Sequence, residues 1–82
     1  MDPFNRLDAL IETGGADAVE QARALLSSLA GGTEIGEQAV DEFLIEMMTL
    51  SFLVESDREA LQASARRLAR LRLSRLKVLF AA

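Results

Sequence analysis

The 82-residue chain contains no cysteine, histidine, tyrosine or tryptophan, and it has a single proline. Without cysteine there is neither a disulfide nor a thiolate metal site. Without histidine the chain lacks the commonest general base, the commonest metal ligand and the usual pH switch. A catalytic site would have to be built from carboxylates, hydroxyls, arginine and one lysine. We therefore expect a protein without enzyme activity, cofactor or bound metal.

Apolar runs long enough to cross a membrane are also lacking. The densest run, 43–54, is far shorter than the roughly 20 residues that a bilayer requires, and Glu46 interrupts it. No apolar segment of the signal-peptide type follows the acidic start Met1-Asp2-Pro3. We expect a soluble, cytoplasmic protein that does not bind membranes, because packing within a helical hairpin also explains the amphipathic pattern near the C-terminus.

Half of the residues are apolar, and Leu, Ala, Glu and Arg, which all favour helices, dominate the composition. This length has room for one domain, so we predict a single all-α domain over 1–82. Two short N-terminal helices, the first opened by Asp2-Pro3 and closed by Gly14, are predicted to pack on a long antiparallel hairpin. The hairpin arms are predicted at about 33–54 and 57–80, which makes a small four-helix domain.

Local signals mark the ends of the hairpin arms. Thr33 is the predicted cap of the first arm, after the stop Gly31-Gly32. Ser56 followed by Glu59 has the spacing of a capping box and predicts that the second arm starts at Ser56. A two-residue alternation over 71–80 leaves a terminal strand open as an alternative to helix.

The first hairpin arm is apolar on most of its circumference, with a heptad-like seam that includes Phe43, Met47 and Leu50. Such a helix is either central in its own core or shared with a second chain. A smaller apolar strip at Leu71 and Val78 lies on the second arm. We predict an interface made of apolar residues from both arms: Phe43, Met47, Leu50, Leu71, Val78 and Phe80. The alternative is a compact monomer in which the two N-terminal helices cover the first arm.

Charge is divided unevenly along the chain. Residues 1–57 contain twelve acidic and two basic side chains, a net charge of −10, whereas residues 58–82 contain one acidic and seven basic, a net charge of +6. The two parts sum to the overall −4. Such asymmetry indicates that the halves face each other or that one half seeks a partner.

The hairpin lays the basic arm beside the acidic one, so that charges can pair across it. Glu46 lies among apolar residues, and we predict that it pairs with Arg72 or Arg75, since arginine forms bidentate pairs with carboxylates. Whether Glu46 is instead solvated remains open. Arg66, Arg67 and Arg70 are predicted to tune the choice of partner.

These patterns favour a protein-interaction module: a homo-oligomer, or a small adaptor or chaperone-like subunit of a larger assembly. The size and the long hairpin resemble small helical secretion-system subunits and their chaperones in architecture, which does not define a function. The alternative is a nucleic-acid-binding regulator that uses the Arg-rich second arm. The acidic pI near 4.7 and the absence of an aromatic residue on the basic face argue against nucleic acid.

Overall fold

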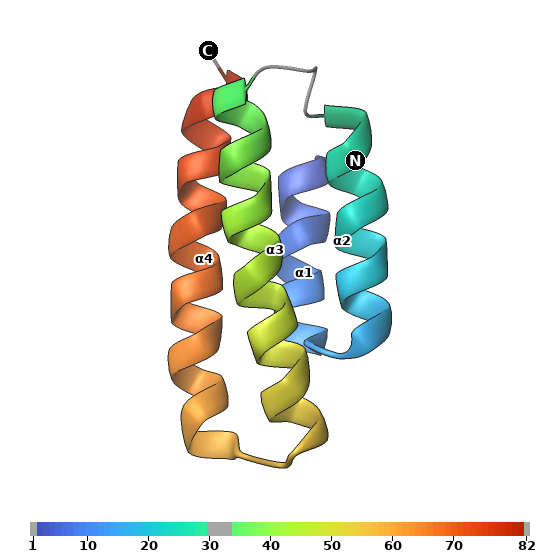
Figure 1. The fold of residues 1–82 in the computed structure, drawn as a ribbon, viewed down its shortest axis with the longest axis vertical. Helices are drawn as coiled ribbons and strands as arrows, with labels where there is room; N and C mark the ends of the chain where they lie inside the picture. Colours follow the sequence, from blue (N-terminus) through green and yellow to red (C-terminus); the bar gives the residue numbers. More distant parts are fainter. Residues whose placement is uncertain (1, 30–33, 82) are drawn as a thin grey trace.

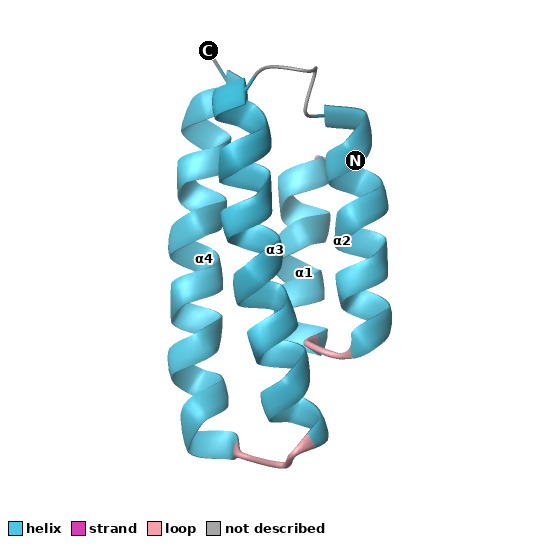
Figure 2. Cartoon of the chain, in the orientation of Figure 1, coloured by secondary structure: helices cyan, strands magenta, loops and turns pink. Residues whose placement is uncertain are grey.

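The computed structural model describes residues 2–29 and 34–81, and within them the chain is helical apart from short turns (Figure 2). The four helices are α1 (Pro3–Thr13), α2 (Ala16–Leu29), α3 (Glu34–Glu55) and α4 (Glu59–Ala81). The predicted all-α fold is confirmed, and α4 is helical through 71–80 with no terminal strand. The predicted stop at Gly31-Gly32 and the predicted cap Thr33 lie outside the described residues.

The helices run alternately down and up the molecule and form a small four-helix bundle (Figure 1). α1 packs on α2 and α4, α3 packs on α2 and α4, and the most extensive contact joins α3 to α4. The α3–α4 hairpin is longer than the α1–α2 pair and extends beyond it at the α3–α4 turn (Figure 1). The bundle measures 37 × 21 × 19 Å.

Both ends of α1 follow the local signals in the sequence. The Asp2 carboxylate accepts a hydrogen bond from Phe4 N at 2.9 Å and caps the helix, with Pro3 in the first turn. At the other end Gly14 adopts φ +70° and donates its N–H to Leu10 O. A Cβ at Gly14 would lie 3.1 Å from Val54 Cγ2, so the turn also packs closely on α3. Glycine is needed here for both conformation and space.

The α3–α4 turn differs from the predicted capping box. α4 begins at Glu59, and the Ser56 hydroxyl donates to Phe52 O at 2.7 Å instead of capping α4. Asp57 takes the left-handed conformation at φ 57°, and its N–H donates to Val54 O while Arg58 N donates to Leu53 O. This is a Schellman arrangement, in which the turn residues satisfy the last carbonyls of α3. The hairpin is as predicted, but Ser56 ends α3 rather than starting α4.

The core runs along the centre of the bundle and draws on all four helices. Its largest fully buried side chains share an apolar character and come from each element: Leu7 and Ile11 from α1, Leu26 from α2, Phe43, Met47 and Leu50 from α3, and Leu76 from α4. Ala22 and Ala69 are fully buried as well, and small side chains there let the helices approach closely. The two short helices therefore complete the core, α2 by packing on α3 and α1 by packing on α2 and α4.

Candidate interaction surfaces

Three of the predicted interface residues lie inside the bundle. Phe43, Met47 and Leu50 have 0% of their surface exposed, because they lie in the core to which all four helices contribute. The heptad-like seam of α3 is therefore part of the chain's own core. The sequence left this open as the alternative to an interface along the first hairpin arm. The surface that the folded chain offers to a partner does not include these residues.

A different side of α3 exposes large apolar residues. Ile45, Met48 and Phe52 are 59%, 52% and 65% exposed, and their spacing of three and four places them on one helix face. We call these three residues the α3 strip. The sequence shows this face only as the extra apolar residues around the seam, and the burial of Met47 is what identifies the outward side.

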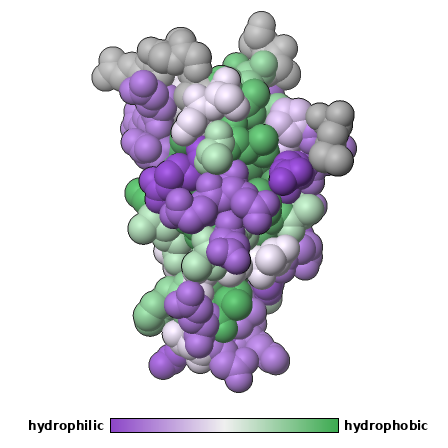
Figure 3. All heavy atoms as spheres, turned by 90° about the vertical axis from the view of Figure 1, so that its right-hand side faces the viewer, coloured by the Kyte–Doolittle hydropathy of each residue, from purple (hydrophilic) through white to green (hydrophobic). Residues whose placement is uncertain are grey.

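Met48 and Phe52 of the α3 strip line a shallow groove between α2 and α3. The groove has a volume of about 300 Å³, and Val19, Met48 and Phe52 are its apolar lining. Glu20, Arg23 and Glu55 line it as well. The side of the molecule over α2 is hydrophilic across its middle, with smaller hydrophobic areas around it (Figure 3). The groove therefore has apolar and charged residues side by side.

α4 carries a second exposed apolar strip. Leu71 and Val78, which were predicted at an interface, are 65% and 72% exposed and are seven residues apart, on one helix face. We call them the α4 strip. Phe80, predicted with them, is half-buried and packs against the core. The two apolar strips therefore lie on different helices.

Arg66, predicted to tune partner choice, contacts the end of α1. Its Nε donates to Ile11 O at 3.2 Å and its Nη2 to Glu12 O at 3.1 Å. These carbonyls belong to the last turn of α1, where they have no partner within the helix. Arg66 thus caps α1 from α4.

Arg70 also binds α1 rather than facing solvent freely. Its Nη2 contacts Glu12 Oε1 at 2.6 Å and its Nε contacts Asp8 Oδ1 at 3.1 Å. The hydrogen bond to Glu12, followed by that to Asp8, raises the pKa of Arg70 above its ordinary value. Because this pKa is raised, the ion pairs of Arg70 stabilise the fold fully at every pH below the unfolded-state pKa of arginine. This stabilisation is lost only as the pH rises through the folded-state pKa. Arg70 therefore stays charged throughout the neutral range.

Glu46 contacts Arg72 as predicted, across the α3–α4 pair. Arg72 Nε lies 3.8 Å from Glu46 Oε1, and the Glu46 side chain is 18% exposed. Glu42 joins the cluster, with its Oε2 at 3.5 Å from Arg72 Nη1 and 3.8 Å from Arg75 Nη1. The buried Arg72 Nε has no hydrogen bond within the described residues, so this is a loose electrostatic cluster. A role for it in setting helix register stays a prediction.

Four exposed charges border the two strips, with opposite signs. Asp41 and Glu55 flank the α3 strip on its own helix, both exposed. Arg67 and Lys77, also exposed, flank the α4 strip. None of these four forms an ion pair in residues 2–29 or 34–81. On its own helix the α3 strip therefore has acidic neighbours, with Arg23 of α2 across the groove, and the α4 strip has basic ones.

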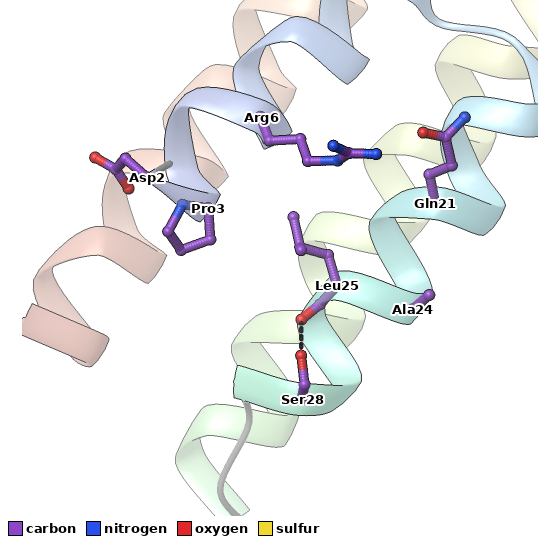
Figure 4. Close-up of a pocket in the computed structure, with 7 residues that line it drawn as sticks. All are labelled: Asp2, Pro3, Arg6, Gln21, Ala24, Leu25 and Ser28. Atoms are coloured by element: carbon purple, nitrogen blue, oxygen red, sulfur yellow. Dashed lines mark hydrogen bonds between the residues drawn. The ribbon is translucent and has the colours of Figure 1, made fainter.

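Another groove, of about 490 Å³, lies between α1 and α2. Arg6 extends toward Gln21 across it, Leu25 lies below Arg6, and Asp2 points away (Figure 4). Asp2 already caps α1, and the Ser28 hydroxyl donates to Leu25 O. The groove thus has no pair of acid and base groups facing a common point.

Within the described part of the chain, no three acidic residues come together as a metal site would require. Across those same residues, no helix is both long and apolar enough to span a membrane. No protein-family model, curated protein or solved structure matches the chain. What the fold defines is a class, a small all-α four-helix domain, and the function is argued from its surfaces.

Proposed function

We propose that this protein is a non-enzymatic protein-interaction module that binds a protein partner through the α3 strip and the α4 strip. The exposure of five large apolar side chains carries this proposal: Ile45, Met48 and Phe52 on α3, and Leu71 and Val78 on α4. The residues of each strip share one helix face, unlike the single exposed apolar residues that most protein surfaces show.

Burying these side chains is energetically favourable. Transfer of a Val, Leu, Ile, Phe or Met side chain from water to an apolar environment gains about 1.5–3 kcal/mol when burial is complete. Each residue of the strips still has half or more of its surface in water, so much of this gain is left for a partner. The charged borders add orientation and specificity more than affinity.

Fewer arginines of α4 are free to bind nucleic acid than the sequence suggests. Arg66 and Arg70 are held by α1, and Arg72 and Arg75 face Glu42 and Glu46. The observations therefore favour a protein partner over phosphate binding.

Photo-crosslinking tests this proposal in the cells that make the protein. A photoreactive amino acid replaces Phe52 in one variant, Leu71 in a second, and the exposed α1 residue Asn5 in a control. Discrete protein adducts from positions 52 and 71, and none from position 5, are the expected result. Absence of adducts at both strip positions, or equal labelling at position 5, would refute the proposal.

A further inference from the structure

We propose that the partner of each strip is a second copy of this chain, bound head to tail, with the α3 strip of one copy on the α4 strip of the next. This inference rests on the proposed interaction function and adds the identity and geometry of the partner. Three features support it: the lengths of the two strips, the opposite charges at their borders, and the surface area that the molecule offers.

The strips match in length. Ile45 and Phe52 are seven residues apart, as are Leu71 and Val78, which corresponds to about 10.5 Å along a helix at 1.5 Å per residue. Two helices that pack side by side bury such strips along their common contact line. The spacing of Leu71 and Val78 therefore fits that of Ile45 and Phe52, and the exposed Leu68, one turn before Leu71, extends the apolar surface of α4.

The borders are complementary in charge. Asp41 precedes the α3 strip and Glu55 follows it, whereas Arg67 precedes the α4 strip and Lys77 lies beside its far end. These side chains are exposed and have no ion pair in the described ranges. Two α3 strips placed together would bring acid against acid, and two α4 strips base against base, which is unfavourable. Opposite strips bring acid against base.

The molecule is also large enough to bury the area of a standard interface. A standard interface buries about 800 Å² per partner, which is about a sixth of the 5132 Å² surface. One long side of a bundle of 37 × 21 × 19 Å offers an area of this order. In the proposed assembly one copy uses both strips at once, each against a different neighbour.

A contact between two different surfaces is heterologous. Each copy then has one free strip after binding, so association continues until a ring closes, or it extends as a filament. A two-fold dimer, by contrast, would use the same strip twice and stop at two chains. This difference makes the proposal testable with variants that each lose one strip.

The experiment uses two double variants of the full chain. Ile45→Gln with Phe52→Gln removes the α3 strip, and Leu71→Gln with Val78→Gln removes the α4 strip. Glutamine favours helices and is neutral, so both the helix propensity and the charged borders are kept. Leu61→Gln, at an exposed α4 residue outside the strip, is the matched control. Circular dichroism and denaturant unfolding verify that each variant is folded.

Sedimentation and light scattering then give the mass of each sample over a wide concentration range. We expect the wild-type chain and the control to grow beyond twice the 8.9 kDa of one chain, and each double variant to remain at one chain. Mixed in equal amounts, the two double variants are expected to form a complex of two chains and nothing larger, because only one pair of intact strips remains.

Other results would overturn the proposal. Continued self-association of either double variant would show a contact between like strips, and a mixture that stays monomeric would show that the strips do not bind each other. A wild-type chain that remains at 8.9 kDa would exclude self-association. In that case the crosslinking decides the proposed function separately: adducts with a different protein retain it, and absence of adducts removes it.

Discussion

Met47 and Met48 are adjacent in the sequence but occupy opposite environments. Met47 is fully buried in the core, whereas Met48 is half exposed and lines the groove between α2 and α3. A step of one residue turns a side chain by about 100° around a helix, which is enough to move it from the core to the surface. At this scale the fold separates residues that serve stability from residues available for binding.

Alanine substitutions at this pair should therefore have different effects. Met47→Ala is expected to lower the free energy of unfolding by about 2–5 kcal/mol, because it removes buried contacts and leaves a cavity. Met48→Ala, the matched control, is expected to change it by less than about 0.5 kcal/mol. Denaturant unfolding at low protein concentration measures both. Equal losses would contradict the assignment of Met47 to the core and Met48 to the surface.

At the scale of elements, α1 depends on α4. An isolated helix of 11 residues is marginal in water, and α1 is tied to α4 by the capping bonds of Arg66 and the ion pairs of Arg70. Exposed ion pairs contribute about 0–1 kcal/mol each. The two carbonyl oxygens that Arg66 contacts depend on it, since no other group in the described residues donates to Ile11 O or Glu12 O from outside α1.

Arg66→Gln is expected to loosen α1 and to lower the free energy of unfolding by about 1–2 kcal/mol, because two helix-end carbonyls lose a charged donor. Arg67→Gln is the matched control, as Arg67 is exposed and makes no such bond. Hydrogen exchange should become faster at the α1 amides in Arg66→Gln and remain unchanged in Arg67→Gln. Equal exchange in the two variants would show that the Arg66 cap does not hold α1.

The whole molecule has an acidic-bordered strip on α3 and a basic-bordered strip on α4, while its net charge is −4. The basic charge of α4 is used in part within the chain, by Glu12, Asp8 and Glu42. The charges bordering the strips are among those that form no ion pair in the described residues. Charge of this kind acts over a Debye length of about 8 Å at physiological ionic strength.

Salt should therefore weaken self-association without abolishing it. The charged borders are screened at about 1 M salt, where the Debye length is about 3 Å, but the apolar strips still bind. We expect the apparent dissociation constant to rise several-fold between low and high salt in sedimentation experiments. Arg67→Gln should reduce this salt dependence. An association that strengthens with salt in the wild-type chain and the variant alike would contradict a role for the borders.

Much of the fold could be predicted from local signals. The cap at Asp2, the stop at Gly14 and the antiparallel hairpin depend on neighbouring residues, and the structure has all three. The capping box at Ser56 was wrong, although its spacing is correct, because the same hydroxyl can donate to the carbonyl four residues earlier. The turn conformation at Asp57 decides between these two bonds.

The sequence by itself determined the number of long helices, their approximate ends and the uneven division of charge, since these follow from residue type and spacing. Only the tertiary structure decided which side of α3 is buried and which arginines are engaged. Arg66 and Arg67 have the same chemistry, and Phe43 and Phe52 are equally apolar. The rotation of each helix about its axis separates them, and that rotation is set by packing against the other three helices.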